Sequence, residues 1–391
     1  MAKKAEEKKP AFFGQQEFAK GLDGVIACET EINYIDGAAG KMIYRGYDIE
    51  EIGEQTNYEE TAYLLLNGRL PTQSELDEFK AKLVSYRPVP SEVIQVLKTI
   101  PTPKTHPMSA LRTGVSVLGT LNPQAEEQTI ENYTDIGLQL IAKLATIAGA
   151  VARIRAGAEP VEPDPSLDHA ANFCYMMTGE KPSEVFERMM DLSLVLHADH
   201  GMNASTFSSM VVISSLTDMY SAIAAGIGSL KGPLHGGANE QVLYMLNEIG
   251  SPDKVDEYVD NVIEKKIKIM GFGHRVYKAY DPRARIFGRH SQALCEAAGK
   301  PELYEIAKRV EDKVIAAYGE KGIFPNVDYY SGTIYHCLGI ETAMFTPLFA
   351  VSRVAGWVAR ILEYLPQNRI FRPRAVYLGD EGLQYVTIEQ R

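Results

Sequence analysis

The sequence lacks the features that mark membrane-spanning, disulfide-stapled and zinc-binding proteins. Its 391 residues include only four cysteines, and none of them forms a CxxC pair: Cys28, Cys174, Cys295 and Cys337. We therefore expect buried, reduced thiols in a cytoplasmic protein rather than a disulfide framework or a zinc cage. No apolar run reaches the length of a membrane span. The first ten residues are charged and contain no arginine, so they resemble neither a signal peptide nor a transit peptide.

Positive charge is also in short supply. The formal net charge is −11 at pH 7, which disfavours binding to nucleic acid or to an acidic membrane surface. Any anionic substrate must therefore meet arginines and lysines that are gathered at one place. The hydrophobic content of 45% and charged content of 23% are ordinary for a globular protein. The length suggests two or three core-forming units.

Strand signals are scarce as well. Residues 24–32 and 41–44 flank the turn-forming residues 36–40 and predict one hairpin. Almost everything after the hairpin has helical character, and there is no strand–helix alternation that would indicate a Rossmann fold. The prediction is an all-α fold with a short N-terminal β-hairpin, and its long helices are expected at 58–66, 134–156, 183–197, 204–225 and 342–364.

The helical pattern changes in the region 250–318. Two segments there carry a single apolar stripe among charged residues, whereas the helices on either side are apolar on several faces. We interpret residues 230–335 as a small helical domain inserted into a large one made of 19–229 and 336–391. Residues 1–18 are expected to be a flexible tail. The glycine-rich stretches 228–237 and 331–340 would serve as hinges.

The most informative segment is Gly-Phe-Gly-His-Arg-Val-Tyr-Lys-Ala-Tyr-Asp-Pro-Arg at 271–283. Its glycines allow close approach of the backbone to a ligand, and His274 can donate a hydrogen bond to a carbonyl oxygen. Lys278 and Arg283 follow at short intervals, and an arginine can hold a carboxylate through two hydrogen bonds. A single histidine in a loop is weak evidence, but this combination indicates a binding site.

Two further segments carry the same kind of chemistry. His235 lies in Gly-Pro-Leu-His-Gly-Gly, just before a helical run, where the helix dipole favours a neutral imidazole that can still donate a hydrogen bond. Asp328 follows the largely apolar residues 323–327. Apolar surroundings raise the pKa of a carboxyl group, and a raised pKa suits it to accept a proton near neutral pH. Each residue alone could equally be a helix cap; together with His274 they favour an active site.

Arginines that could hold substrate carboxylates occur at three positions, Arg283, Arg353 and Arg372. Arg353 lies in a hydrophobic helix next to the only tryptophan, where an arginine without a partner would be costly. Each of the three could instead belong to a structural ion pair.

The segment His197-Ala-Asp-His200-Gly allows a competing hypothesis, a metal site. Histidines three residues apart share one face of a helix, so shared ligation is geometrically possible. No HExxH motif or cysteine accompanies them, which favours His200 as a ligand for an anionic substrate at the end of a helix.

These segments, in this order, resemble the citrate synthase family, and the similarity extends over the chain from about residue 20. The resemblance implies a two-domain helical homodimer that binds oxaloacetate and acetyl-CoA and needs no cofactor or metal. It implies that Asp328 removes a proton from acetyl-CoA, His235 holds the enol, and His274 polarises the ketone of oxaloacetate. By the same resemblance His200, Arg283, Arg353 and, from the partner subunit, Arg372 bind oxaloacetate, while Lys278 and Lys321 lie near the CoA phosphates.

Several alternatives remain open at this point. A 2-methylcitrate synthase would use propionyl-CoA with nearly the same segments, and a citryl-CoA lyase would run related chemistry in the cleavage direction. A scaffold that kept the fold would need none of the three catalytic side chains. A hydrolase built on His197, Asp199 and His200 would need a metal. The short N-terminal tail favours a dimer over the larger hexamers of the family.

Overall fold

The computed structural model describes residues 18–102 and 104–391. These residues form two compact units: residues 30–369 make up one, and the described residues before 30 join residues 370–391 in the other. The predicted flexible tail lies almost entirely outside the described residues.

A small antiparallel sheet opens the larger unit. Its strands, β1 (Asn33–Asp36), β2 (Lys41–Tyr44) and β3 (Tyr47–Asp48), pair in chain order, with Asn33 opposite Tyr44 and Ile43 opposite Asp48. The hairpin prediction was right for β2 and its turn but wrong for residues 24–32, which are not a strand. At the end of that segment, Thr30 and the backbone N–H of Glu31 bond to the carboxylate of Glu363 instead.

Sixteen α-helices follow within the described residues, so the all-α prediction is confirmed. Their bounds are α1 Ile49–Gln55, α2 Tyr58–Asn67, α3 Gln73–Tyr86, α4 Ser91–Thr99, α5 Pro107–Leu121, α6 Ile130–Arg155, α7 His169–Thr178, α8 Glu184–His197, α9 Ala204–Ile213, α10 Met219–Leu230, α11 Ala238–Ile249, α12 Val255–Glu264, α13 Pro282–Ala297, α14 Pro301–Tyr318, α15 Val327–Cys337 and α16 Phe345–Tyr364.

Local sequence explains where several helices begin and end. Asn57 caps the start of α2, and Gly68 ends it in the left-handed conformation. Thr72 and Glu75 form a capping box that starts α3. The single helix predicted over 204–225 is wrong: the chain breaks between α9 and α10, where Leu216 has a φ of 61° and Asp218 caps the new helix.

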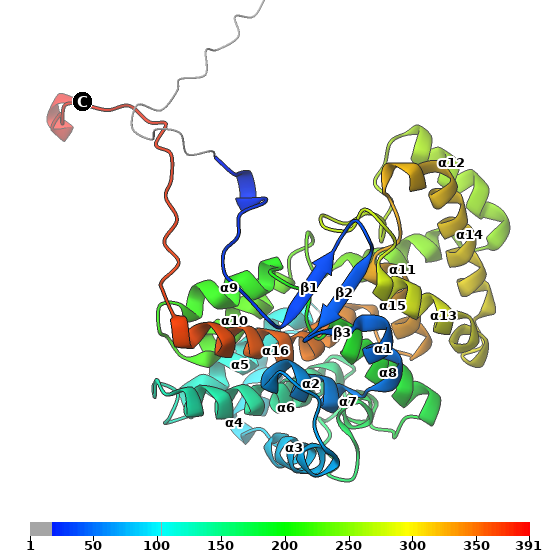
Figure 1. Ribbon diagram of the computed structural model, residues 1–391, viewed down its shortest axis with the longest axis horizontal. Coiled ribbons are helices and arrows are strands. Elements are labelled where there is room, and N and C mark those ends of the chain that lie inside the picture. Colours follow the sequence, from blue (N-terminus) through cyan, green and yellow to red (C-terminus); the bar gives the residue numbers. More distant parts are fainter. Residues whose placement is uncertain (1–17, 103) are drawn as a thin grey trace, which may run out of the picture. The chain divides into compact units, whose positions relative to one another are not determined.

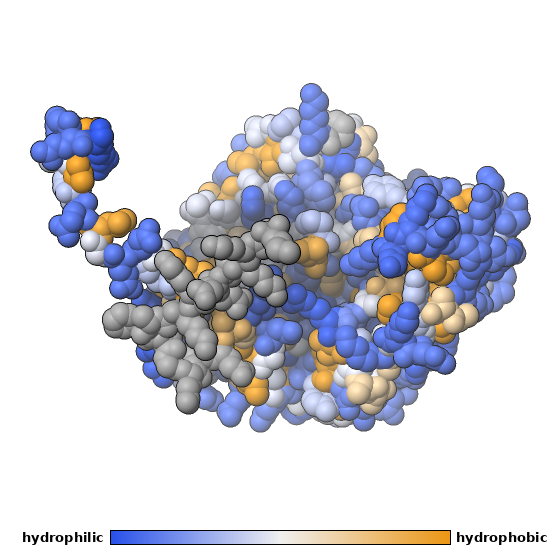
Figure 2. Space-filling view, turned by 90° about the horizontal axis from the view of Figure 1, so that it is seen from above, coloured by the Kyte–Doolittle hydropathy of each residue, from blue (hydrophilic) through white to orange (hydrophobic). Residues whose placement is uncertain are grey.

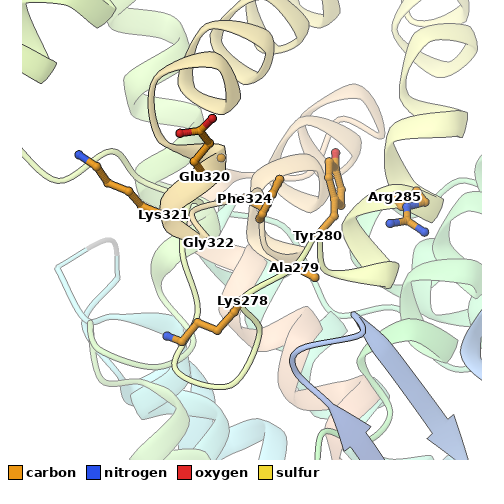
Figure 3. A pocket seen from close by; sticks show the side chains of 9 residues that line it. Lys278, Ala279, Tyr280, Arg285, Glu320, Lys321, Gly322 and Phe324 are labelled. Carbon is orange, nitrogen blue, oxygen red and sulfur yellow. The ribbon is translucent and has the colours of Figure 1, made fainter.

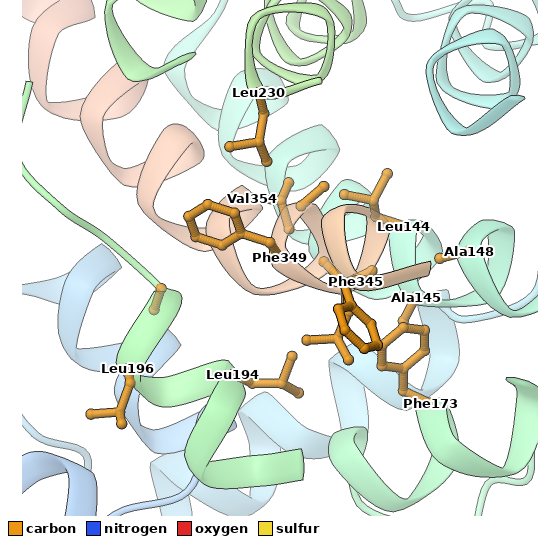
Figure 4. Close-up of a cluster of buried hydrophobic side chains, with 14 of the residues drawn as sticks. Leu144, Ala145, Ala148, Phe173, Leu194, Leu196, Leu230, Phe345, Phe349 and Val354 are labelled. Carbon is orange, nitrogen blue, oxygen red and sulfur yellow. The ribbon is translucent and has the colours of Figure 1, made fainter. Parts of the chain in front are cut away.

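The core is built around α16, which is buried along almost its whole length. Figure 4 shows Phe345, Phe349 and Val354 of this helix among apolar side chains from α6, α7, α8 and α10. Two stretches, Ile130–Arg155 and Thr342–Gln367, have the length and hydropathy of a membrane span, contrary to our reading of the sequence. Their most apolar windows are 78% and 94% buried inside the fold, as in the core helices of a soluble protein.

Helices α11 to α15 gather on one side of the larger unit, away from α3 and α4 (Figure 1). Helices α13 and α15 pack against each other, and their C-terminal ends meet at Cys295 and Cys337, whose sulfur atoms are 3.3 Å apart. These two cysteines and Cys174 are buried, whereas Cys28 is only partly buried, so the expectation of buried thiols fails at that position.

Candidate active site

All but one of the predicted catalytic and oxaloacetate-binding residues of the larger unit come from helix ends or from the loops beside them. His200 follows the end of α8, His235 precedes α11, and His274 lies between α12 and α13. Arg283 and Asp328 are the second residues of α13 and α15, and Arg353 lies within α16. The pKa of His200 is lowered by burial and then by Arg283, His274, Arg353 and His235, so these side chains act on one another across one site.

His235 is held in a single tautomer by its surroundings. Its Nε2 atom accepts a hydrogen bond from the backbone N–H of Ser205 at 3.1 Å and lies 2.8 Å from the Ser205 hydroxyl. Asn203 Oδ1, 3.2 Å from the same nitrogen, already accepts the backbone N–H groups of Ser205 and Thr206. A backbone N–H can only donate, so the proton of a neutral ring must lie on Nδ1. Burial, followed by the charge of Arg353, lowers the pKa of His235 to about 4, which keeps the ring neutral at pH 7. His235 is therefore a neutral donor through Nδ1.

His274 is fixed in the opposite tautomer. Its Nδ1 atom accepts hydrogen bonds from the backbone N–H groups of Val276 and Tyr277 at 3.0 and 3.3 Å. The proton of the neutral ring must then lie on Nε2. Burial and then Arg283 lower its pKa to about 4. Its ring centroid is 5.2 Å from that of His200 and 5.0 Å from that of Tyr277.

Asp328 has the properties of a general base. Its Oδ1 atom is buried and has no hydrogen-bond partner among the described residues. Burial raises its pKa to about 7, although Arg283 works in the other direction. A carboxyl group that titrates near neutrality accepts a proton better than an ordinary aspartate and is still partly ionised at pH 7.

Two arginines supply positive charge to the site, and both are buried. Arg353 donates from Nε to the carbonyl oxygen of His197 at 2.6 Å and lies over the ring of Phe349. Burial lowers its pKa to about 10, so it stays charged at pH 7, and its buried Nη2 has no partner among the described residues. Arg283 binds Asp281 through Nε at 3.1 Å and Nη2 at 2.8 Å.

The segment 197–201 contains positioning contacts that the sequence analysis missed. Asp199 is fully buried and binds Arg360 of α16 at 3.1 Å. Gly356 lies one turn before Arg360, and a Cβ atom placed on it would lie 2.3 Å from the carbonyl oxygen of Ala198. Only glycine allows this approach of α16, and it brings Arg353 to the same segment. Regularly spaced arginine, glycine and arginine at 353, 356 and 360 were the signal available in the sequence.

His197 and His200 do not share a site, contrary to the geometry expected for a metal. Helix α8 ends at His197, whose ring packs between Phe287 and Phe349, with centroids at 5.7 and 4.7 Å. His200 lies beyond the helix end, beside His274. Across residues 18–102 and 104–391, no group of three or more His, Cys, Asp or Glu side chains could hold a metal ion.

A groove of about 800 Å³ collects the two lysines that were expected near CoA phosphates. Lys278 and Lys321 line it together with Arg285, Tyr280 and Phe324. Figure 3 shows the lysines on separate loops and the rings of Tyr280 and Phe324 side by side; the ring centroids are 6.3 Å apart. Lys278 also belongs to the His274 loop, because its Nζ donates to the carbonyl oxygen of His274 at 3.4 Å.

Arg372 is not among the residues that the larger unit brings together. It belongs to the unit containing residues 370–391 and is exposed there. This C-terminal segment carries many exposed apolar or aromatic side chains: Val376, Tyr377, Leu378, Leu383, Tyr385, Val386 and Ile388. Figure 2 shows orange side chains among the blue ones of this segment.

A family model described as "Citrate synthase, C-terminal domain" matches residues 21–374. The chain belongs to the citrate synthase family. It is 45% identical over 373 residues to a citrate synthase of Deinococcus radiodurans, a match that covers 95% of this chain and 99% of that one. Membership confirms the resemblance drawn from the sequence and makes the chain an enzyme that forms citrate and CoA from acetyl-CoA, oxaloacetate and water.

Solved structures of the family are equally similar. The crystal structure of citrate synthase from Pyrobaculum aerophilum has a TM-score of 0.91 and 42% identity, and each chain is covered completely. A citrate synthase from Thermoplasma acidophilum, solved as a ternary complex with carboxymethyl coenzyme A and oxaloacetate, has a TM-score of 0.90 and 37% identity. That match covers 96% of this chain and all of the other.

Proposed function

We propose that Asp328, His235 and His274 carry out the condensation of acetyl-CoA with oxaloacetate in this chain. The observation that carries the proposal is the opposite fixing of the two histidines, with the proton of His235 on Nδ1 and that of His274 on Nε2. Two neutral donors and one base with a pKa near 7 are what an enolisation followed by attack on a ketone requires.

The reaction would begin at the methyl group of acetyl-CoA. Asp328 takes a methyl proton, and the electron pair of the C–H bond forms an enolate whose oxygen accepts the Nδ1 proton or hydrogen bond of His235. The enolate carbon then attacks the ketone carbon of oxaloacetate. The former ketone oxygen becomes an alkoxide that the Nε2–H of His274 stabilises, and it is protonated as Asp328 gives up the proton it took, which leaves citryl-CoA. Water then attacks the thioester, and the C–S bond breaks to give citrate and CoA.

Oxaloacetate would be held by His200, Arg283 and Arg353. Among the described residues, His200 Nε2 and Arg353 Nη2 are buried without partners, which is a costly state that an anionic substrate would relieve. Arg283 already gives Nε and Nη2 to Asp281, so its remaining Nη1 is the group for a substrate carboxylate. The ternary complex of the Thermoplasma acidophilum enzyme with oxaloacetate supports this substrate.

The groove with Lys278 and Lys321 would receive the phosphates of CoA. Two lysines and Arg285 concentrate positive charge on a chain whose net charge is −11, although Glu320 opposes them. The link from Lys278 to His274 supports a CoA groove beside the proposed oxaloacetate site. Small-domain closure of residues 230–335 over 19–229 and 336–391 would exclude water before the thioester is activated.

The working enzyme would be a cytoplasmic homodimer without a bound cofactor. The exposed apolar side chains of residues 370–391 support association, because a second copy could cover them. Arg372 in this segment would then reach the oxaloacetate site of the partner subunit.

The test is CoA-thiol release with oxaloacetate and either acetyl-CoA or propionyl-CoA, for the wild type and Asp328→Ala. Turnover that prefers acetyl-CoA and disappears in the variant supports the proposal. A preference for propionyl-CoA would make the chain a 2-methylcitrate synthase with the same machinery. Cleavage of citryl-CoA without synthesis would indicate a lyase, and full activity of Asp328→Ala would refute the assigned base.

A further inference from the structure

Glu311 of α14 is a buried carboxylate on the face of the helix whose other buried residues are apolar. Glu311 follows Val310 and lies four residues after Ala307, both buried, and only 4% of its surface is exposed. Burying a carboxylate is unfavourable unless hydrogen bonds or an ion pair replace the water that it loses. Within residues 18–102 and 104–391, its one cationic partner is Lys308, at 3.2 Å, whose side chain is 44% exposed.

Both oxygens of Glu311 accept a tyrosine hydroxyl. Tyr280 donates to Oε1 and Tyr330 donates to Oε2. Burial, followed by the charge of Glu311, raises the pKa of both tyrosines, so each phenol keeps its proton and remains a donor. Glu311 therefore joins the segment that carries Tyr280 to the first turn of α15.

The two tyrosines belong to different parts of the proposed site: Tyr280 to the CoA groove and Tyr330 to the helix that carries the base Asp328. Tyr280 forms part of the groove wall, and the guanidinium carbon of Arg285 lies 5.5 Å from the centre of its ring. Tyr330 is buried in the first turn of α15, two residues after Asp328. The neighbouring Tyr329 donates to the carbonyl oxygen of Ala307 at 2.5 Å, which fixes the same turn to α14 a second time.

We propose that Glu311 is a positioning residue that sets the groove wall through Tyr280 and the base Asp328 through Tyr330. The inference rests on the proposed function, because it takes the groove as the CoA site and Asp328 as the base. If Glu311 had a purely structural role, its hydrogen bonds would affect only the stability of the fold. Loss of one tyrosine bond would then not change the KM for acetyl-CoA and loss of the other would not change kcat.

Three variants separate the effect that Glu311 has through Tyr280 from the effect that it has through Tyr330. Tyr280→Phe should raise the KM for acetyl-CoA about three- to tenfold with kcat and the KM for oxaloacetate unchanged, because one hydrogen bond to a charged group is lost. Tyr330→Phe should lower kcat by a similar factor with little change in the KM for acetyl-CoA. Glu311→Gln should do both, because it removes the negative charge that strengthens both hydrogen bonds and its amide nitrogen cannot accept the second hydroxyl.

The matched control is Glu305→Gln, which removes the same charge from an exposed position of the same helix. Adding Tyr280→Phe to Glu311→Gln should raise the KM for acetyl-CoA by a smaller factor than it does in the wild type, because the hydrogen bond that it removes is already weakened. Wild-type turnover with Glu311→Gln behaving like Glu305→Gln would overturn the inference alone. Equal effects of both tyrosine variants on kcat and KM would also overturn it. Absence of wild-type turnover would instead refute the proposed function.

Discussion

Replacing Asp328 with asparagine should abolish activity and at the same time stabilise the fold at alkaline pH. Burial raises the pKa of Asp328 from 3.8 to about 7. Between these two values the folded state binds a proton that the unfolded state has already lost. The free energy of unfolding contributed by this group is therefore highest below pH 3.8 and falls as the pH rises towards 7.

The size of the effect follows from the shift. A difference of about 3 pKa units corresponds to about 4 kcal/mol of lost stability above pH 7, at ~1.36 kcal/mol per unit. Asparagine has the same shape and no charge, so Asp328→Asn should recover a gain that approaches this value at pH 8 and shrinks to about 1.5 kcal/mol near pH 5.

Urea unfolding of wild type and Asp328→Asn at pH 5 and pH 8, at one protein concentration, measures both values. Asp312→Asn on α14 is the matched control, because its carboxylate is 62% exposed and its ion pair should contribute little at either pH. The reasoning is refuted if Asp328→Asn is no more stable than wild type at pH 8, or if its advantage is the same at both pH values.

Three further predictions concern the same site. With Asp328 as the base, kcat should fall about tenfold per pH unit below pH 7, because only the ionised carboxylate accepts the proton; a flat profile down to pH 5.5 would contradict this. His235→Gln and His274→Gln should each lower kcat by about 10²–10³-fold in CoA-release assays, and a loss below threefold would exclude that donor. Gly356→Ala should lower stability in urea by about 1–3 kcal/mol, because its new Cβ meets the Ala198 carbonyl; Gly228→Ala, whose Cβ would only make ordinary contact with the Arg112 side chain at 3.6 Å, should not.

Helix positions were the most predictable part of the fold, because capping residues and apolar periodicity are local. Asn57, Gly68 and Ser183 mark helix ends in the sequence as they do in the structure. The break between α9 and α10 was missed because both helices are apolar and only Asp218 and a strained Leu216 mark it. Residues 24–32 have a strand-like composition. Whether such residues form a strand depends on the segments that lie beside them in the fold, and the local sequence does not specify those neighbours.

The site was predictable to the extent that its residues fall in recognisable segments. The family confirms the reaction, while the individual roles of His235, His274 and Asp328 stay predictions. The tautomers could not be predicted, because they depend on backbone N–H groups of Ser205 and Val276 that only the folded chain presents. The same holds for Glu311, which reads as one more surface glutamate of an amphipathic helix.

The contact between Cys295 and Cys337 has a consequence for chemical labelling. Arg283 starts the helix that ends near Cys295, about 18 Å away, and Asp328 starts the helix that ends at Cys337, about 14 Å away, at 1.5 Å per residue. The two helices thus touch at the sulfurs at one end and carry site residues at the other. A thiol reagent that adds a group to either sulfur must push the C-terminal ends of α13 and α15 apart. It would therefore disturb Arg283 and Asp328 from the opposite ends of these helices. Inactivation by such a reagent would therefore not show that a cysteine lies in the active site.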